Sequence, residues 1–215
     1  KNKGFTAKHL NELQGLVQTS VKQYTDAQIN ASNFIKYANE FKPGVINWQG
    51  HGNWDSTARK IWAVDYDYNG YPTEDEIKWD DFISNDFVSK FDSKYPSIYV
   101  SSSCLNLYPE KDNIGKNIIT LGSGVAILGN TRSSWYFPNL TYNKIEDNPS
   151  MYSLSAMFLN YLSNGDFLGD ALNKAYSWYY QTFSSDSDIL ETIAHNIYCF
   201  NLYGEPILSL KSFTD

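Results

Sequence analysis

Short apolar runs alternate with amphipathic helical segments along this 215-residue chain. The runs at 45–48, 97–100 and 124–128 have the length and composition of buried strands. Alternation of helix and strand is typical of an α/β fold, because each helix returns the chain so that consecutive strands lie parallel. The pattern therefore predicts a three-layer sandwich, in which a mostly parallel sheet is flanked by helices on both faces.

Apolar residues at helical spacing separate these strands. They predict helices over residues 6–20, 32–41, 80–91, 113–120, 151–162 and 167–183, with Ser32 as the cap of the second helix. A short strand is expected at 21–24, and a polar loop is expected between His51 and residue 80. Folds of this type usually open with a strand rather than a helix. We therefore expect residues 1–215 to be a single domain cut from a longer precursor, whose first strand comes from an upstream segment or a separate chain.

The composition suits one compact domain and restricts its partners. Hydrophobic residues make up 42% of the chain, and a domain of this size buries roughly 70% of its unfolded surface. The net charge of −7 argues against nucleic acid and anionic membranes as partners. No run approaches the roughly 18 apolar residues of a membrane span. Abundant tyrosine, asparagine and serine with little lysine favours a secreted or cell-surface protein.

Two of the predicted strands end in residues that suit a thiol peptidase. Gly50-His51-Gly52 follows the strand at 45–48, and three serines and Cys104 follow the apolar part of the strand at 97–100. Neighbouring parallel strands bring their carboxyl ends to one edge of the sheet. We therefore expect His51 to lie beside Cys104, as an imidazole base beside a thiol nucleophile.

The residues around this pair suit acyl transfer. His51 would take the thiol proton and return it to the leaving amine. The glycines that flank it let the backbone approach a substrate, and the N–H groups of Gly52 and Cys104 are expected to form an oxyanion hole. Ser103 and the two serines before it are small, which keeps this strand end open for substrate.

The second cysteine leaves two alternatives open. A disulfide between Cys104 and Cys199 would exclude a thiol nucleophile. A zinc ion shared by His195 and Cys199 would need two further ligands, and none stands at suitable spacing nearby. We therefore expect His195 to be a core histidine whose ring is hydrogen-bonded.

Four segments of the chain resemble the gingipain family of cysteine peptidases, which belongs to the clan of caspases and legumain. They are residues 47–54 (NWQGHGNW), 102–106 (SSCLN), 125–135 (VAILGNTRSSW) and 202–208 (LYGEPIL). The resemblance extends over roughly residues 45–210. It implies a caspase-like fold, endopeptidase activity, secretion, an autoprocessed precursor and frequent structural calcium.

The same resemblance assigns roles by position. It makes His51 the base, Cys104 the nucleophile and Gly52 an oxyanion donor, and it places Trp135 against the residue before the scissile bond. Leu107 departs from the family, which often has glycine there.

Arg132 is a candidate substrate contact on different grounds, because it follows the strand after the nucleophile. The alternative for Arg132 is an ion pair with a carboxylate of the acidic loops.

Residues 65–76, with the sequence DYDYNGYPTEDE, fit the twelve-residue calcium loop of EF-hands. Asp65, Asp67, Asn69 and Glu76 would be side-chain ligands, and Tyr71 would bind through its carbonyl oxygen. Every donor is a hard oxygen, which suits Ca²⁺ as a structural ion. The alternative is a solvated acidic turn.

These patterns together predict a secreted cysteine endopeptidase that cleaves protein or peptide substrates through an acyl-enzyme on Cys104. The acidic balance slightly favours basic residues before the scissile bond, as in the best-known members of the gingipain family. An N-terminal fragment of the same precursor is a candidate partner. The alternative is a catalytically inactive peptidase-fold domain that serves as a calcium-stabilised surface or adhesion module. A transpeptidase with the same dyad would differ only in its acceptor.

Overall fold

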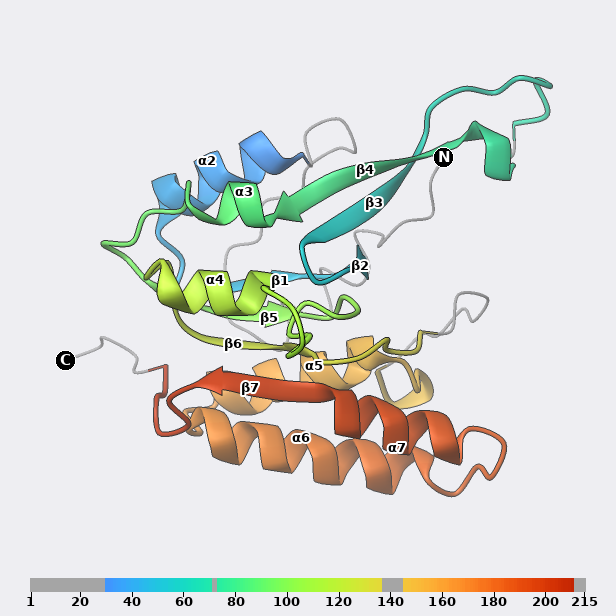
Figure 1. The fold of residues 1–215 in the computed structure, drawn as a ribbon. Helices are drawn as coiled ribbons and strands as arrows, with labels where there is room; N and C mark the ends of the chain where they lie inside the picture. Colours follow the sequence, from blue (N-terminus) through green and yellow to red (C-terminus); the bar gives the residue numbers. More distant parts are fainter. Residues whose placement is uncertain (1–29, 71–72, 137–144, 211–215) are drawn as a thin grey trace.

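The structure is a computed structural model that describes residues 30–70, 73–136 and 145–210 (Figure 1). The helix predicted at 6–20 and the strand predicted at 21–24 lie outside these ranges. The central sheet contains β1 (Val45–Trp48), β5 (Ser97–Ser101), β6 (Gly124–Asn130) and β7 (Phe200–Gly204), in the order β1-β5-β6-β7. The first three are parallel, and β7 pairs antiparallel with β6. The predicted α/β class with a mostly parallel sheet is confirmed.

Helices cover both faces of this sheet (Figure 1). One face carries α2 (Ala31–Phe41), α3 (Asn85–Val88) and α4 (Ile114–Thr120), and the other carries α5 (Met151–Ser163), α6 (Leu168–Phe183) and α7 (Leu190–Cys199). Successive residues of a strand point to opposite faces. Ile98 and Val100 of β5 accordingly pack with α5 and α6, while Tyr99 between them packs with α2 and α4. All five residues of β5 are buried, as expected for a strand covered on both faces.

Asparagine side chains define where two of the helices begin. The Oδ1 atom of Asn30 accepts a hydrogen bond from the Asn33 amide at 2.9 Å, so α2 begins at Ala31 and the predicted cap Ser32 lies inside the helix. Asn113 caps α4 in the same way, through a 2.8 Å bond from the Lys116 amide. The predicted helices at 151–162 and 167–183 match α5 and α6 within a residue at each end.

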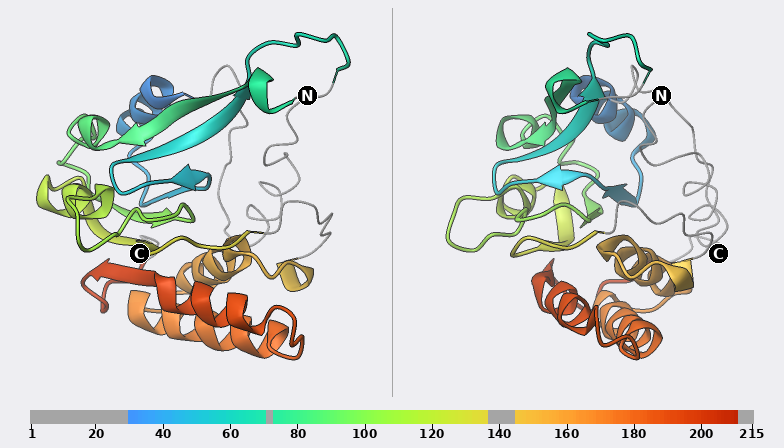
Figure 2. Two further views of the ribbon diagram at one scale, coloured as in Figure 1. Left: turned by 45° about the vertical axis from the view of Figure 1, so that its right-hand side comes forward. Right: turned by 90° about the vertical axis from the view of Figure 1, so that its right-hand side faces the viewer.

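A second, antiparallel sheet projects from the body of the molecule (Figure 2). It contains β2 (His51–Gly52), β3 (Ser56–Trp62) and β4 (Ile77–Ser84), in the order β2-β3-β4. We call β3, β4 and the loop that joins them the arm. Ile83 near the base of the arm is fully buried with α2 and α4, which anchors the arm to the central sheet.

The arm corrects two predictions. The helix expected at 80–91 is wrong, because residues 80–84 belong to β4 and only Asn85–Val88 is helical. The polar loop expected after His51 contains β3. Phe82, Ile83, Phe87 and Val88 fit a helical period, but pairing along the whole of β3 satisfies the backbone of residues 77–84 and overrides that local pattern.

No helix in the described ranges is both long and apolar enough to cross a membrane.

Candidate active site

Cys104 lies in the turn that directly follows β5, and its side chain is partly exposed. Leu105 after it has a left-handed backbone with φ +60°, which is uncommon for a leucine. Three backbone bonds hold this turn, from Tyr108 N to Leu105 O at 2.9 Å, from Leu107 N to Asn130 O at 3.0 Å and from Leu105 N to Arg132 O at 3.3 Å. Unusual backbone held by its surroundings is frequent at functional sites.

The turn of Cys104 packs against the backbone of the predicted histidine motif. His51 and Gly52 form β2, and the side chain of His51 is exposed. A Cβ atom at Gly52 would lie 2.4 Å from the Cys104 carbonyl oxygen and 3.0 Å from the Cys104 amide nitrogen. Only glycine allows this approach. The structure therefore brings Gly52, the residue after His51 in β2, against the backbone of Cys104.

Asn106 fixes the Cys104 turn to the histidine hairpin. Its side chain is fully buried. Its Oδ1 atom accepts a 2.6 Å hydrogen bond from the Ser101 hydroxyl, and its Nδ2 atom donates to the Asn53 carbonyl at 2.7 Å. Sequence reasoning gave Asn106 no role, although it lies in the segment SSCLN that resembles the gingipain family.

Ser103 and Leu107 both point away from solvent. Ser103, which the sequence suggested as a substrate contact, is fully buried, and its carbonyl accepts a 3.0 Å bond from Asn130 Nδ2. Leu107 is also fully buried, and its side chain packs against Gly115 and Gly129. The departure from the family at Leu107 is therefore accommodated in the core, and the Leu107 side chain does not obstruct the approach to Cys104.

The peptide group between Ser133 and Ser134 lies between the side chains of Cys104 and Cys199. The Ser134 amide points to Cys104 Sγ at 3.3 Å, and Ser133 O of the same peptide lies 3.9 Å from Cys199 Sγ. The remaining polar contacts of Cys104 Sγ go to the carbonyl and hydroxyl oxygens of Ser134, both at 3.6 Å. Both cysteines are free thiols, so the disulfide alternative is not realised.

Cys199 is in contact with an imidazole. Its Sγ atom lies 3.2 Å from Nε2 of His195, one helical turn earlier in α7. Cys199 is fully buried, and this burial raises the pKa of its thiol. The same Nε2 atom lies 2.7 Å from Ser133 O, so His195 is hydrogen-bonded as predicted, although it is only partly buried. In the described part of the chain, no third metal ligand joins this pair.

Trp135 is positioned by α7, a helix that the sequence pattern did not predict. The Trp135 amide donates to Asn196 Oδ1 at 2.8 Å, and its carbonyl accepts from the Met151 amide at 3.1 Å. Asn196 is fully buried and also donates to the Tyr179 hydroxyl at 3.0 Å. The backbone of Trp135 is thus held on both sides, while its indole is 57% exposed next to the Cys104 site.

Arg132 forms the ion pair that was the alternative to a substrate contact. Its guanidinium makes a bidentate contact with Glu110, with N–O distances of 2.7 and 3.2 Å. It also lies over the Tyr108 ring, 5.1 Å from the ring centre. Both partners of the ion pair are largely exposed, so it contributes little to stability.

The acidic loop at the tip of the arm gathers three of the predicted calcium ligands. Carboxylate oxygens of Asp65, Asp67 and Glu76 all lie within 4.8 Å of one another. Asn69 lies beside them, with its Nδ2 atom 2.6 Å from Asp67 Oδ2. Tyr71, the predicted carbonyl ligand, lies outside the described residues.

The loop backbone already organises these oxygens. The Thr73 and Tyr66 amides donate to Glu76 at 3.1 and 2.5 Å, and the Thr73 bond is the main cause that lowers the pKa of Glu76. The Gly70 amide donates to Asp65 Oδ2 at 3.1 Å, while the buried Oδ1 of Asp65 has no partner in the described residues. The group fits a hard cation, because all of its donors are oxygens.

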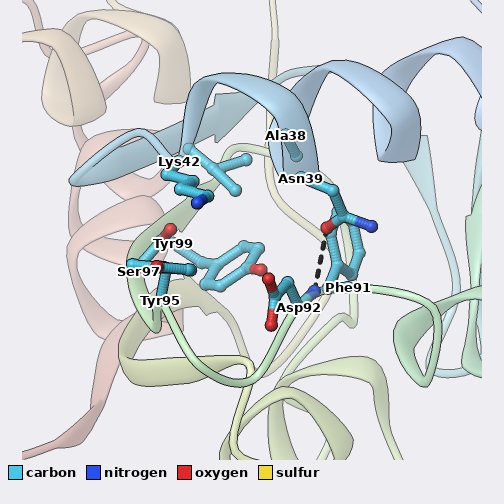
Figure 3. A pocket seen from close by; sticks show the side chains of 9 residues that line it. Ala38, Asn39, Lys42, Phe91, Asp92, Tyr95, Ser97 and Tyr99 are labelled. Carbon is cyan, nitrogen blue, oxygen red and sulfur yellow. Dashed lines mark hydrogen bonds between the residues drawn. The ribbon is translucent and has the colours of Figure 1, made fainter.

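A small pocket elsewhere is too small for a substrate side chain. It lies between α2 and the loop before β5, where Asn39 Oδ1 accepts a 2.8 Å bond from the Asp92 amide (Figure 3). Its free volume of about 10 Å³ is roughly the space of one water molecule.

The model of peptidase family C25 matches residues 5–211. The chain belongs to this family. The family is that of the gingipains, so the predicted resemblance is confirmed and the chain is a cysteine peptidase. A caspase-like fold is consistent with this membership. No curated protein matches the chain.

Proposed function

We propose that this C25 peptidase is an endopeptidase in which Cys104 is the nucleophile and His51 is the general base. The proposal rests above all on the packing of Gly52 against the Cys104 backbone, which leaves room for no side chain between the histidine strand and the thiol turn. Cys199 is the competing thiol, but a peptide cannot reach a side chain that is fully buried.

The residues suit two-step acyl transfer. Cys104 Sγ forms a bond to the scissile carbonyl carbon while His51 takes the thiol proton. His51 then gives that proton to the amine nitrogen as the C–N bond breaks. In the second step His51 takes a proton from water, whose oxygen attacks the thioester. The C–S bond breaks, His51 returns the proton to Cys104 Sγ, and the carboxylic acid product leaves.

Backbone donors are available for the oxyanion. In the described part of the chain, the Cys104 amide has no acceptor, and Gly52 is packed directly beside it. An N–H group aimed at the oxyanion stabilises the transition state by about 3 kcal/mol. We assign the oxyanion site to the amides of Cys104 and Gly52.

We further propose that Trp135 lines the pocket for the residue before the scissile bond. Its exposed indole follows Ser134, whose amide contacts Cys104 Sγ. A flat aromatic face can stack on the stem of a lysine or on an arginine guanidinium. This property, together with the net charge of −7, supports a preference for basic residues there.

Peptidyl acyloxymethyl ketones test both proposals, because such inhibitors alkylate an active thiol. A panel that varies only the residue before the ketone is incubated with the protein, and the modified cysteine is mapped by mass spectrometry. We expect modification at Cys104, faster with lysine or arginine than with leucine or glutamate. Cys104→Ala is the control and should remain unmodified.

Equal rates across the panel would remove the basic preference but keep the nucleophile. Modification at Cys199, or at neither cysteine, would contradict the proposed dyad, and the second result would favour the inactive surface or adhesion module.

We also propose that the acidic loop binds Ca²⁺ as a structural ion. The support is the convergence of Asp65, Asp67 and Glu76, the neighbouring Asn69 and the unpartnered Asp65 Oδ1. A ligand that binds only the folded state stabilises it by about 2.7 kcal/mol at a hundred times its Kd. Calcium should therefore raise the melting temperature of the wild type and not that of Asp65→Asn, with Asp86→Asn as a matched control on the surface. Equal shifts in all three proteins would exclude this site.

The lowered pKa of Glu76 gives this loop a pH dependence. Its contribution to stability is complete above the ordinary pKa of a glutamate and is lost as pH falls through the lowered folded value. Calcium-dependent stabilisation should weaken over the same range.

Secretion or display at the cell surface is proposed from the composition and from the gingipain resemblance. Cell fractionation after expression of the full precursor tests it, because recovery only from the cell interior would contradict it. We also predict that residues 1–215 are excised from that precursor as a single domain. We further predict that this domain associates with an N-terminal fragment of the same precursor.

A further inference from the structure

The imidazole of His51 lies against the indole of Trp79. The two ring centres are 4.5 Å apart, and the ring planes meet at 85°. Such an edge-to-face arrangement places the positive edge of one ring on the electron-rich face of the other. Trp79 belongs to β4 and is 50% exposed, so the core does not require an indole at this position.

The register of the small sheet explains how residues on two different strands meet. His51 of β2 is paired with Ala58 of β3, and Trp79 of β4 is paired with Lys60 of β3. Residues two apart on a strand share a face, so His51 and Trp79 occupy one face, on the two sides of β3. Ala58 between them carries only a methyl group. An aromatic side chain at the diagonal position can therefore reach across β3 to the imidazole.

We propose that Trp79 is a positioning residue for His51, a role that rests on the proposed function of His51 as the base. The indole restricts the orientation of the imidazole. We infer that the indole presents its face to the edge of the imidazole, so that it also favours the imidazolium form that arises when His51 takes the thiol proton, because a cation is attracted to the face of a tryptophan. Trp79 thus acts through His51 and not on the substrate.

A carboxylate lies on the same face as this histidine. Asp81 is paired with Ala58 and so shares the face of His51. The backbone of Cys104 packs against Gly52, the residue that follows His51 in β2. A test of Trp79 by pH dependence must therefore separate the indole from the carboxylate of Asp81.

The variants Trp79→Leu and Trp79→Phe are compared with wild type in pH profiles of kcat and kcat/KM on a peptide substrate. We expect kcat of Trp79→Leu to fall roughly tenfold with KM unchanged, because misplacement of a catalytic group slows the chemical step. The acidic limb of its profile should move to lower pH, since His51 must be neutral to act as the base and the imidazolium is less favoured. Trp79→Phe should keep most of the rate.

Two control variants complete the comparison. Tyr95→Leu removes an aromatic side chain of equal exposure, 49%, at the pocket of Figure 3 and should leave both profiles unchanged. Asp81→Asn should not reproduce the effect of Trp79→Leu. If it does, or if Trp79→Leu raises KM alone or changes nothing, the positioning role is wrong.

A titration of the histidine rings by NMR gives a readout that needs no turnover. The chain has only three histidines, His9, His51 and His195, and His51→Gln assigns the relevant signal. We expect the midpoint of the His51 titration to be lower in Trp79→Leu than in wild type. An unchanged midpoint would overturn the inference about Trp79. A wild type that cleaves no peptide would instead overturn the proposed function.

Discussion

Cys104 and Cys199 lie on opposite sides of one peptide group but in contrasting surroundings. Cys104 is partly exposed in a turn after a parallel strand, with the Ser134 amide directed at its sulfur at 3.3 Å. Cys199 ends a helix, is fully buried and has a raised pKa. Yet it is Cys199 whose sulfur lies 3.2 Å from an imidazole.

Under the proposed assignment of Cys104, closeness of a thiol and an imidazole does not by itself identify the nucleophile. Catalysis also needs access for the substrate and backbone donors where the oxyanion will form. Cys104 is partly exposed and its amide has no acceptor among the described residues, whereas Cys199 is fully buried. His195 is bonded to the Ser133 carbonyl, so it holds the segment that borders the site.

The largest expected difference is between the two cysteine-to-alanine variants. Cys104→Ala should lower kcat/KM by at least a factor of about 10³, because the acyl-enzyme cannot form. Cys199→Ala should keep most of the activity and lose only about 1 kcal/mol of stability through a small cavity. Peptide hydrolysis and thermal unfolding measure the two effects. Activity that survives in Cys104→Ala and disappears in Cys199→Ala would reverse the assignment.

The two histidines should differ by a smaller factor. His51→Gln should lower kcat by roughly 10²–10⁴, the usual contribution of a general acid–base. His195→Gln removes a hydrogen bond to Ser133 O, worth about 0.5–1.5 kcal/mol, and should reduce kcat by less than about tenfold. Initial rates over a range of substrate concentrations check both values. Similar losses in the two variants would show that His195 takes part in more than holding the loop.

The smallest effect concerns the contact that brings the histidine strand to the thiol. In Gly52→Ala the new methyl group would meet the Cys104 carbonyl at 2.4 Å and displace the turn, so kcat/KM should fall by roughly tenfold or more. Gly44→Ala is the matched control, because its nearest contact would be an ordinary 3.7 Å from Leu210. The same assay compares them. A fully active Gly52→Ala would mean that this close approach is not needed for catalysis.

Sequence reasoning succeeded where one strand or one loop contains the whole signal. The apolar runs before His51 and Cys104 predicted parallel neighbours, and β1 and β5 pair in this way. The spacing of Asp65, Asp67 and Glu76 predicted a cluster that local turns bring together. It failed at residues 80–84, where Phe82 and Ile83 fit a helix as well as a strand, and only pairing with β3 decides between the two.

Some site residues carried no sequence signal, because their roles depend on partners far along the chain. Asn106 is hydrogen-bonded to Asn53, Asn196 is hydrogen-bonded to Trp135, and the ring of Trp79 lies against that of His51. Each is a polar or aromatic residue whose neighbours in the sequence do not indicate its contact. Only the folded structure shows which residue it contacts.

The amino-acid sequence by itself determined the fold class and the family, and it predicted which thiol and imidazole react, because periodicity and short motifs are local properties of a chain. Tertiary structure decided which cysteine a substrate can reach, that Arg132 pairs with Glu110, and that Ser103 is buried. Burial and long-range pairing depend on all the elements that pack around a residue. A linear pattern of residue types does not contain that information.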